Sequence, residues 1–524
     1  MPRRPQPDTP TTTEATPVVP PVRAVLVGQG ALPVPVGPLV RRSGTFFIRR
    51  SFRENALYKH VLRSYVDYLL EKRFPLEWYI EGGRSRTGKL LPPRFGMLAY
   101  VVDAFRRGKS DDVHLIPVSI AYDQIQEVKT YADEQTGGDK RKESLGWFVG
   151  VVRAMRRPYG EIHIHFGEPL SLRDSLGPPR PGTAPDPDER NLELRKLAFE
   201  VSVRINRETP VTATSFVALA LLGTGERALT VPEVRAGLAN LLRYVQKRKL
   251  PETHDLAYLA TDEGVRSALD ALRANGVLSR YDGGREPIYR IGPEQQLSAA
   301  YYRNNIVHFF VNGGLAEVAL LQACQRAEGE ARVEAFWQAA FALRDLLKFE
   351  FFFAERDAFR RELEDELAFR EPAWAERLAS DPEGGLVLVS SFEPYMAHRV
   401  LRPFLDAYCV VAAELAFRGD EPVTDEKEFM NAALGLGVQF QLQQRIQSTA
   451  SISKALYEAA VRLADHRGLN RRDEDDPEAG LAQARQVFRA EVVAAAEQVA
   501  QIAELAASRR ARVLAATAGT TGGE

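Results

Sequence analysis

The sequence contains only two cysteines, Cys324 and Cys409, and they form no C-x-x-C pair. This scarcity excludes a zinc or redox site built from several cysteines, argues against a disulfide framework, and fits a reducing cytosolic environment. The chain also has no excess of one charge, because it contains 69 Lys and Arg residues and 70 Asp and Glu residues, for a net charge of −1. This balance argues against binding of nucleic acid through overall charge, although it leaves room for a local basic patch.

Long hydrophobic runs are also missing. The least polar stretch, residues 209–225, has an apolar centre of only a few residues at 216–222, which is too short to cross a bilayer. The chain begins Met-Pro-Arg-Arg-Pro and continues with Pro and Thr, so we expect no signal peptide. Peripheral attachment to a membrane stays compatible with this composition.

The 524 residues, 45% of them apolar and 27% charged, can bury the cores of about three to five domains. Changes in composition and periodicity divide the chain. We expect a disordered Pro/Thr-rich tail at 1–36, an α/β region at 37–208, a helical, winged-helix-like module at 209–298, a helical domain at 299–470, and a charged linker with an Ala-rich terminal helix at 471–524.

The α/β assignment depends on strands that alternate with helices. Short strands are expected at 76–80, 114–120 and 161–166, and helices at 55–73 and 96–107. In the winged-helix-like module, helices at 230–247 and 261–275 precede a β-hairpin at 277–291. The same order also fits a support layer for the α/β region, which is the interpretation we favour.

The first block with chemical content runs from Gly37 to Phe52 and contains Arg41, Arg42, Arg49 and Arg50. Arginine presents a fixed fork of donors to phosphate, so this density suits an anionic ligand. A basic surface facing solvent or lipid headgroups explains it equally well.

The second block is Glu-Gly-Gly-Arg-Ser-Arg-Thr-Gly-Lys, from Glu81 to Lys89. It contains G-x-x-x-x-G-K, but Leu90 stands where a nucleotide P-loop needs Ser or Thr, and prolines follow where its helix must begin. We therefore expect a Gly-lined turn that brings two arginines to a small phosphate, with Glu81 holding a ligand hydroxyl or an arginine. The alternative is a structural Glu–Arg pair in a tight loop.

The third block, Leu115 to Asp123, is a strand interrupted by Pro117. Proline removes a donor from the ladder of hydrogen bonds, so it predicts a sheet edge or a bend. Such a bend can shape the wall of a pocket.

In this order, the three blocks resemble motifs II, III and IV of the bacterial glycerol-3-phosphate 1-O-acyltransferases, in their long, membrane-associated form. The resemblance continues in Phe-Gly-Glu-Pro at 166–169 and in Tyr-Tyr-Arg-Asn-Asn-Ile-Val-His at 301–308, and so covers about residues 37–470. It is shared in part with dihydroxyacetone-phosphate acyltransferases.

The resemblance implies an α/β acyltransferase domain, with a mixed sheet flanked by helices, followed by a mostly α-helical C-terminal region. It implies transfer of an acyl group from acyl-CoA or acyl-carrier protein to the sn-1 hydroxyl of glycerol 3-phosphate, at the cytoplasmic face of the cell membrane. No metal, cofactor or nucleic-acid partner is implied. The candidate substrate-binding residues are Arg50, at the phosphate, Glu81, Gly82, Arg84, Ser85 and Arg86, in the glycerol-phosphate site, and Pro117, at the acyl-side wall.

One departure from the family pattern concerns its catalytic motif, His-x-x-x-x-Asp, in which the histidine acts as general base. None of the eight histidines has an aspartate at this spacing, so we assign no catalytic residue. The nearest approach is His163 with Glu168, and His60 lies between the second and third motifs. Two hypotheses explain the departure: a truncated or frame-shifted chain whose residues 1–36 are not native, or a scaffold that binds glycerol phosphate or membrane without turnover. A nucleic-acid binder using the basic patch at 41–59 is the third and least favoured interpretation.

Overall fold

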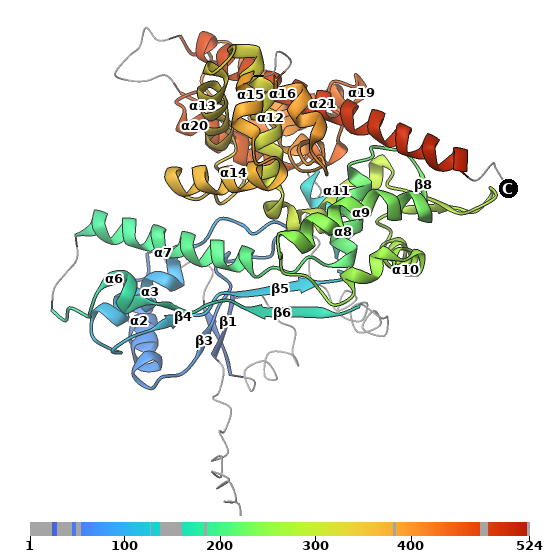
Figure 1. Ribbon diagram of the computed structural model, residues 1–524. Helices are drawn as coiled ribbons and strands as arrows, with labels where there is room; N and C mark the ends of the chain where they lie inside the picture. Colours follow the sequence, from blue (N-terminus) through green and yellow to red (C-terminus); the bar gives the residue numbers. More distant parts are fainter. Residues whose placement is uncertain are drawn as a thin grey trace, which may run out of the picture. The chain divides into compact units, whose positions relative to one another are not determined.

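The computed structural model describes residues 24–28, 44–48, 54–125, 127–136, 160–182, 186–380, 384–471 and 480–520 (Figure 1). The basic block with Arg50 lies outside the described residues, apart from a short strand inside it. The chain divides into two compact units, which we describe separately. Unit 1 comprises Met1–Gly83, Pro92–Ile116 and Pro169–Val201, and unit 2 comprises Arg84–Leu91, Pro117–Glu168 and Ser202–Glu524.

Unit 1 contains a three-stranded parallel sheet of order β2-β1-β3. Strand β1 (Ala24–Gly28) is central and pairs with β2 (Thr45–Ile48) and β3 (Leu76–Glu77). A second, antiparallel pair joins β4 (His114–Leu115) to β7 (Leu170–Ser171). Parallel and antiparallel pairing together agree with an α/β region, although the described strands do not join into one hydrogen-bonded sheet.

The central position of β1 corrects one expectation. Residues 1–36 were expected to form a disordered tail, yet residues 24–28 supply the strand that holds the other two together. Its sequence, Ala-Val-Leu-Val-Gly, is the apolar run that a buried parallel strand requires. The prolines on either side of this run obscured the signal.

The helices of unit 1 are linked by ion pairs. Asn55 caps α2 (Ala56–Glu71) by accepting a hydrogen bond from the Tyr58 amide at 2.8 Å. Arg190 binds both carboxylate oxygens of Asp103 at 2.9 and 2.8 Å, which ties α7 (Pro187–Arg207) to α3 (Phe95–Arg106). The short helix α6 (Leu172–Leu176) follows β7. The expected helices are confirmed to within two residues, because their amphipathic periods and caps are local signals.

The α/β part of unit 2 is a two-stranded antiparallel ribbon, β5 (Val118–Tyr122) with β6 (Ile162–Phe166). The strand expected at 114–120 is broken in two, because Ile116 and Pro117 separate β4 from β5. Pro117 therefore lies at a bend, as predicted, and its carbonyl accepts the Gly167 amide at 2.8 Å. Helix α4 (Val128–Gln135) follows the ribbon.

A small module follows in unit 2, with a three-stranded antiparallel sheet of order β8-β10-β9. Thr230 begins α9 with a capping box: its hydroxyl accepts the Glu233 amide at 3.4 Å, and the Glu233 carboxylate accepts the Thr230 amide at 2.8 Å. The elements, in chain order, are α8 (Ala213–Leu222), β8 (Leu229–Thr230), α9 (Val231–Lys247), η1 (Leu256–Ala260), α10 (Asp262–Ala274), β9 (Ser279–Tyr281) and β10 (Ile288–Arg290). The expected hairpin is present as β9 and β10.

The remainder of unit 2 is helical (Figure 1). Its core contains α12 and α18, whose residues are mostly buried. The helices are α11 (Gln296–Ile306), α12 (Val311–Arg326), α13 (Ala331–Leu346), α14 (Arg356–Arg370), α15 (Trp374–Ser380), α16 (Gly384–Ser391), α17 (Ala397–Val400), α18 (Arg402–Phe417), α19 (Glu426–Leu442), α20 (Lys454–His466) and α21 (Leu481–Thr520), with 3-10 turns η2 (Pro293–Gln295), η3 (Val307–Phe309) and η4 (Thr449–Ser451).

A buried charge network crosses this helical region. Arg370 donates at 2.8 Å both to Glu317 and to Glu366, and the three side chains are almost fully buried. The second oxygen of Glu366 accepts the hydroxyl of Tyr244 at 2.9 Å. The network thus joins α9, α12 and α14, and removal of one partner would leave an uncompensated charge in the core.

Among the described residues, no single helix is long and apolar enough to cross a bilayer. One pair bent by 77°, Pro293–Phe309 with Val311–Arg326, satisfies the same criterion by length and composition only. Most residues of α11 and α12, which make up most of this pair, are buried in unit 2.

Candidate active site

The second sequence block folds as a tight loop, residues Arg84–Leu91, which we call the motif loop. Within it, the Ser85 hydroxyl donates to the Lys89 carbonyl at 2.6 Å, and the Lys89 amide donates to the Thr87 hydroxyl at 3.3 Å. Gly88 has φ +81°, and a Cβ there would lie 2.0 Å from the carbonyl oxygen of Tyr301. Glycine is therefore required at position 88 for two reasons, the positive φ of the backbone and the close approach of α11.

Two buried amide side chains hold the backbone of the motif loop. Asn304 on α11 donates to the Thr87 carbonyl, and Gln135 at the end of α4 donates to the Arg86 carbonyl, both at 2.7 Å. Gln135 is itself oriented by the Ser453 hydroxyl, which donates to it at 2.9 Å. These bonds connect the loop to residues 49 and 217 positions away in the chain, so they make the loop part of the helical core.

Lys89 stands at the lysine position of a P-loop pattern, but its environment differs from a phosphate site. Its ammonium group pairs with Glu350, and the two side chains are 12% and 2% exposed. The ammonium also lies 4.9 Å and 4.7 Å from the ring centres of Phe351 and Phe404. Burial lowers the pKa of Lys89, while Glu350 acts in the opposite direction. Because this lysine is committed to a buried ion pair, the structure supports the rejection of a P-loop.

The two arginines of the motif loop are its most exposed cations. The Arg84 side chain is 63% exposed and lies 3.8 Å from Glu127, while Arg86 is partly exposed and pairs with Glu134. A nearby buried cation, Arg303, donates to the side chain of its neighbour Asn304 and lies 5.9 Å from the ring centre of Phe404, and burial lowers the pKa of Arg303 to about 9. The motif loop therefore presents guanidinium groups on a rigid backbone, which is the arrangement that recognition of a small phosphate needs.

The preceding part of the second block belongs to unit 1. Gly82 has φ +65°, and its amide donates to the Tyr79 carbonyl at 3.0 Å. A Cβ at this position would lie 2.9 Å from Cγ of Arg94, so the turn also depends on glycine. Glu81 is half-buried next to it. Thus Glu81 and Gly82 lie in one unit, whereas Arg84, Ser85, Arg86 and Pro117 lie in the other.

A histidine–carboxylate pair lies on the ribbon of unit 2. His163 Nε2 is 3.2 Å from Asp123 Oδ1, and the side chains are 11% and 16% exposed. Asp123 also accepts the Glu161 amide at 2.9 Å. By spacing in the sequence, the acid nearest to the family pattern for His163 was Glu168. In the structure the partner of His163 is Asp123, 40 residues away, because the antiparallel register brings the end of β5 beside the start of β6. His60 is exposed on α2.

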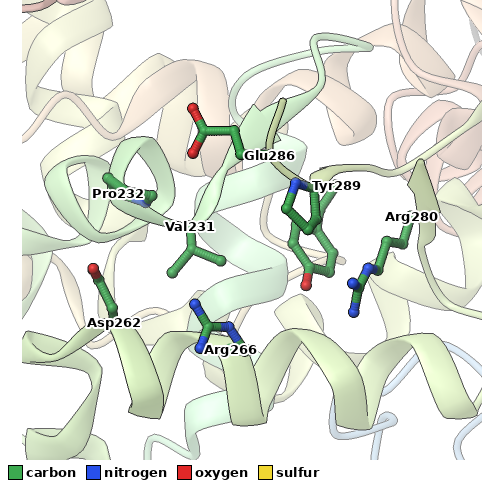
Figure 2. A pocket seen from close by; sticks show the side chains of 8 residues that line it. Val231, Pro232, Asp262, Arg266, Arg280, Glu286 and Tyr289 are labelled. Carbon is green, nitrogen blue, oxygen red and sulfur yellow. The ribbon is translucent and has the colours of Figure 1, made fainter. Parts of the chain in front are cut away.

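The described residues contain no group of three His, Cys, Asp or Glu side chains suited to a metal ion. A cavity of about 330 Å³ lies in the small module, lined by the start of α9, by α10 and by the β9–β10 hairpin (Figure 2). The lining contains two arginines, Arg266 and Arg280, and two acids, Asp262 and Glu286, so it carries no net formal charge and does not favour phosphate.

Comparison with known proteins identifies the chain. Residues 131–473 match the family described as glycerol-3-phosphate acyltransferase C-terminal region, and residues 15–121 match the acyltransferase family. The chain belongs to the glycerol-3-phosphate acyltransferase family. The plsB1 proteins of Mycobacterium tuberculosis and Mycobacterium bovis are each 39% identical to it over 474 residues, covering 90% of this chain and 75% of theirs. A glycerol-3-phosphate acyltransferase of Aeromonas hydrophila is 36% identical over 306 residues, 57% of this chain and 37% of its own length.

The acyltransferase match corrects, for residues 15–36, the hypothesis that residues 1–36 are foreign to the family. The match begins at residue 15, and β1 lies inside it. The resemblance noted in the sequence starts at Gly37 because the quoted motifs start there, whereas the apolar run of β1 carries no charged or polar side chain.

Sequence reasoning missed the residues that support the motif loop of this glycerol-3-phosphate acyltransferase family member. Asn304 lies in the 301–308 signature, which was a usable signal of its importance but not of its partner. Gln135 and Glu350 have no local signal, because their contacts exist only after the chain has folded.

Proposed function

We propose that this acyltransferase family member transfers a fatty acyl group from acyl-CoA or acyl-carrier protein to the sn-1 hydroxyl of glycerol 3-phosphate, as a step of phospholipid synthesis. The observation that carries the proposal is the motif loop, whose backbone is held by Asn304 and Gln135 while Arg84 extends into solvent. The α/β part, as a mixed sheet flanked by helices, is proposed as the acyltransferase domain, with a helical region after it.

In this reaction the glycerol oxygen bonds to the thioester carbon, the carbon–sulfur bond breaks, and the thiol leaves with the proton of the hydroxyl. The chain's part in this proposal is to bind and orient the phosphate. In this proposal Arg84 and Arg86 neutralise its charge. The roles proposed for Glu81 and Gly82 at the glycerol phosphate and for Pro117 at the acyl chain rest on the sequence resemblance alone, as does the proposed contact of Arg50 with the phosphate.

We also propose a peripheral location on the cytoplasmic face of the cell membrane. A monoacylated product is poorly soluble in water, so release into a lipid surface is favourable. The ribbon of unit 2 supports the proposal, because one face of it exposes Ile120, Tyr122, Ile162, Ile164 and Phe166. Flotation with phospholipid vesicles tests it, and a chain that stays at the bottom of the gradient at low salt contradicts it.

Calorimetric titration of glycerol 3-phosphate into the whole chain tests the substrate site. We expect binding in the native chain and at least a ten-fold weaker affinity in Arg84→Ala, because one charge-assisted contact to phosphate is lost. The matched control is Lys129→Ala, which removes an exposed cation from nearby α4. Equal affinity in all three chains would refute the assignment of Arg84.

Turnover is a separate measurement: transfer of labelled palmitoyl from CoA to glycerol 3-phosphate with phospholipid present. If the chain turns over, His163→Gln is the first substitution to make, because His163 is held by Asp123 as a general base would be. The control is His60→Gln on the exposed face of α2. Binding without turnover would mean that the site lacks its base.

A further inference from the structure

Four basic side chains in the helical part of unit 2 are not among the residues assigned above. They are His398 and Arg399 on α17, Arg402 at the start of α18, and Arg510 on α21, and we call them the cation cluster. Helix α17 packs against both α18 and α21, and also against α8. Helical hydrogen bonds continue across the junction, from the Leu401 amide to Ala397 and from the Leu405 amide to Leu401, so residues 398 and 402 share one face.

The position of Arg399 is fixed by carbonyl groups and not by an acid. Its Nη1 donates to the Ala220 carbonyl at 3.1 Å, and its Nε donates to the Tyr395 carbonyl at 3.2 Å. Gly223 makes room for it, because a Cβ there would lie 2.7 Å from Cγ of Arg399. The guanidinium is thus held in place while its positive charge stays uncompensated by these contacts.

Several polar atoms of the cluster are buried without a hydrogen bond to the described residues. By geometry they are both ring nitrogens of His398, whose side chain is 6% exposed and has the Gly223 backbone as a polar neighbour, and Nη1 of Arg510. Buried polar atoms in folded proteins nearly always have a partner, so these atoms call for an explanation. An anionic group with several acceptor oxygens could accept from Nη1 of Arg510 and from the one N–H that a neutral His398 ring carries.

The carboxylates near the cluster are already engaged. Glu317 accepts hydrogen bonds from Arg370 and from the Met396 and Ala397 amides. Asp406, on α18, accepts hydrogen bonds from the backbone amides of Gln447 and Ser448.

The charges repel one another in consequence. Burial, followed by the charges of Arg399, Arg402 and Arg510, lowers the pKa of His398 well below its ordinary value, and only the backbone at Gly223 acts in the opposite direction. Burial and Arg510 lower the pKa of Arg399 to about 10, although the charge of Glu317 acts in the opposite direction. An arrangement of like charges at this depth is costly unless a counter-charge binds among them.

We propose that the cation cluster is a binding site for a phosphate group, carried either by a free phosphorylated ligand or by a lipid headgroup. The guanidinium groups of Arg399, Arg402 and Arg510 would bind its oxygens, since arginine matches phosphate in geometry and charge. The N–H of His398 would donate one further hydrogen bond. This site does not depend on the proposed acyl transfer.

The test measures thermal unfolding of the whole chain with and without inorganic phosphate, at constant ionic strength set with chloride. We expect phosphate to raise the midpoint of the native chain, because a ligand that binds only the folded state stabilises it. In Arg510→Gln we expect at least a ten-fold weaker apparent affinity. Without phosphate, this variant should be at least as stable as the native chain, since it relieves repulsion. A residue with only a structural role would instead destabilise the chain when replaced.

Two control variants make the result specific. Arg509→Gln changes the neighbouring arginine, which pairs with Glu393, and should respond to phosphate as the native chain does. Arg84→Ala changes the motif loop and should also keep the response. If Arg510→Gln does not fold, Arg402→Gln replaces it in the same experiment.

The inference is overturned if phosphate leaves the native midpoint unchanged, or if Arg84→Ala loses the response while Arg510→Gln keeps it. Failure of glycerol 3-phosphate binding at Arg84 would leave this result unaffected, so the two proposals fail separately. Vesicles of phosphatidylcholine with and without phosphatidic acid identify the source. Flotation that requires phosphatidic acid and Arg510 indicates a headgroup, and a midpoint shift by phosphate without flotation indicates a free ligand.

Discussion

Gly88→Ala is the sharpest test of how the helical region supports the candidate active site. Alanine at φ +81° costs about 1–2 kcal/mol, because a Cβ is disfavoured in the left-handed region. Its Cβ would also lie 2.0 Å from the Tyr301 carbonyl oxygen, a distance that no relaxation of side chains can relieve, since backbone is involved. The motif loop must therefore move away from α11.

The movement has a second cost, which can be worked from the hydrogen bonds of the loop. Asn304 and Gln135 each donate to a loop carbonyl at 2.7 Å, and both side chains are buried. Loss of one of these bonds leaves a buried polar group unsatisfied, at about 1–3 kcal/mol. We therefore expect Gly88→Ala to lower the free energy of unfolding by about 2–5 kcal/mol.

Two other glycines separate the contributions. Gly276 has φ +70° with nothing near its Cβ position, so Gly276→Ala should cost only the conformational term of about 1–2 kcal/mol. Gly83 has open space and no positive φ, so Gly83→Ala should stay within about 0.5 kcal/mol of the native chain. Urea unfolding followed by circular dichroism measures all three.

Limited trypsin digestion gives an independent reading, because the motif loop contains Arg84, Arg86 and Lys89. A displaced loop is a better protease substrate, so cleavage there should be faster in Gly88→Ala than in either control. If Gly88→Ala and Gly276→Ala agree both in stability and in cleavage, the close approach of the loop to Tyr301 does not exist and the reasoning is refuted.

Three further changes test other parts of the fold. Glu317→Ala removes one of the acids that neutralise the buried Arg370 and should lower the free energy of unfolding in urea by about 3–5 kcal/mol. The control Glu364→Ala, in an exposed pair on the same helix as Arg370, should lower it by under about 1 kcal/mol. Equal losses would contradict the buried network. Burial raises the pKa of Asp406 to about 6, above its unfolded value. The stability of the folded chain that depends on the protonated carboxyl group is therefore fully present below about pH 4 and is lost as the pH rises through 6. Asp406→Asn should therefore gain stability relative to the native chain between pH 4 and 7, by up to about 3 kcal/mol, and a gap that does not change with pH would argue against the buried carboxylate. Thr230→Ala removes a capping hydroxyl and should lower the thermal midpoint through a loss of about 1 kcal/mol, and an unchanged midpoint would show that the cap contributes little.

Much of the local structure could be predicted because its causes are local. The helix at 230–247 was predicted from its periodicity and begins one residue later, where Thr230 and Glu233 form a capping box. The β9–β10 hairpin follows from Asp-Gly-Gly at 282–284. The strand at 114–120 was predicted with its proline, but the pairing that splits it, β4 with β7 and β5 with β6, could not be read locally.

The chemistry offered by the motif loop can be read from its residues alone. Gly88 permits the turn, the two arginines supply the charge, and Leu90 with the prolines that follow the loop excludes a P-loop helix. These properties depend on backbone conformation and side-chain type at neighbouring positions, so no folded context is needed to read them.

The residues that hold the motif loop in place come together only when distant segments pack against one another. Asn304 reaches Thr87, Glu350 neutralises Lys89, and Asp123 pairs with His163, across separations of 40 to 261 residues. The same applies to β1, whose apolar run became a central strand only through pairing on both sides. Such contacts depend on which surfaces the packing of the helices and strands brings together. The local sequence pattern around each residue does not indicate its partner in the folded chain.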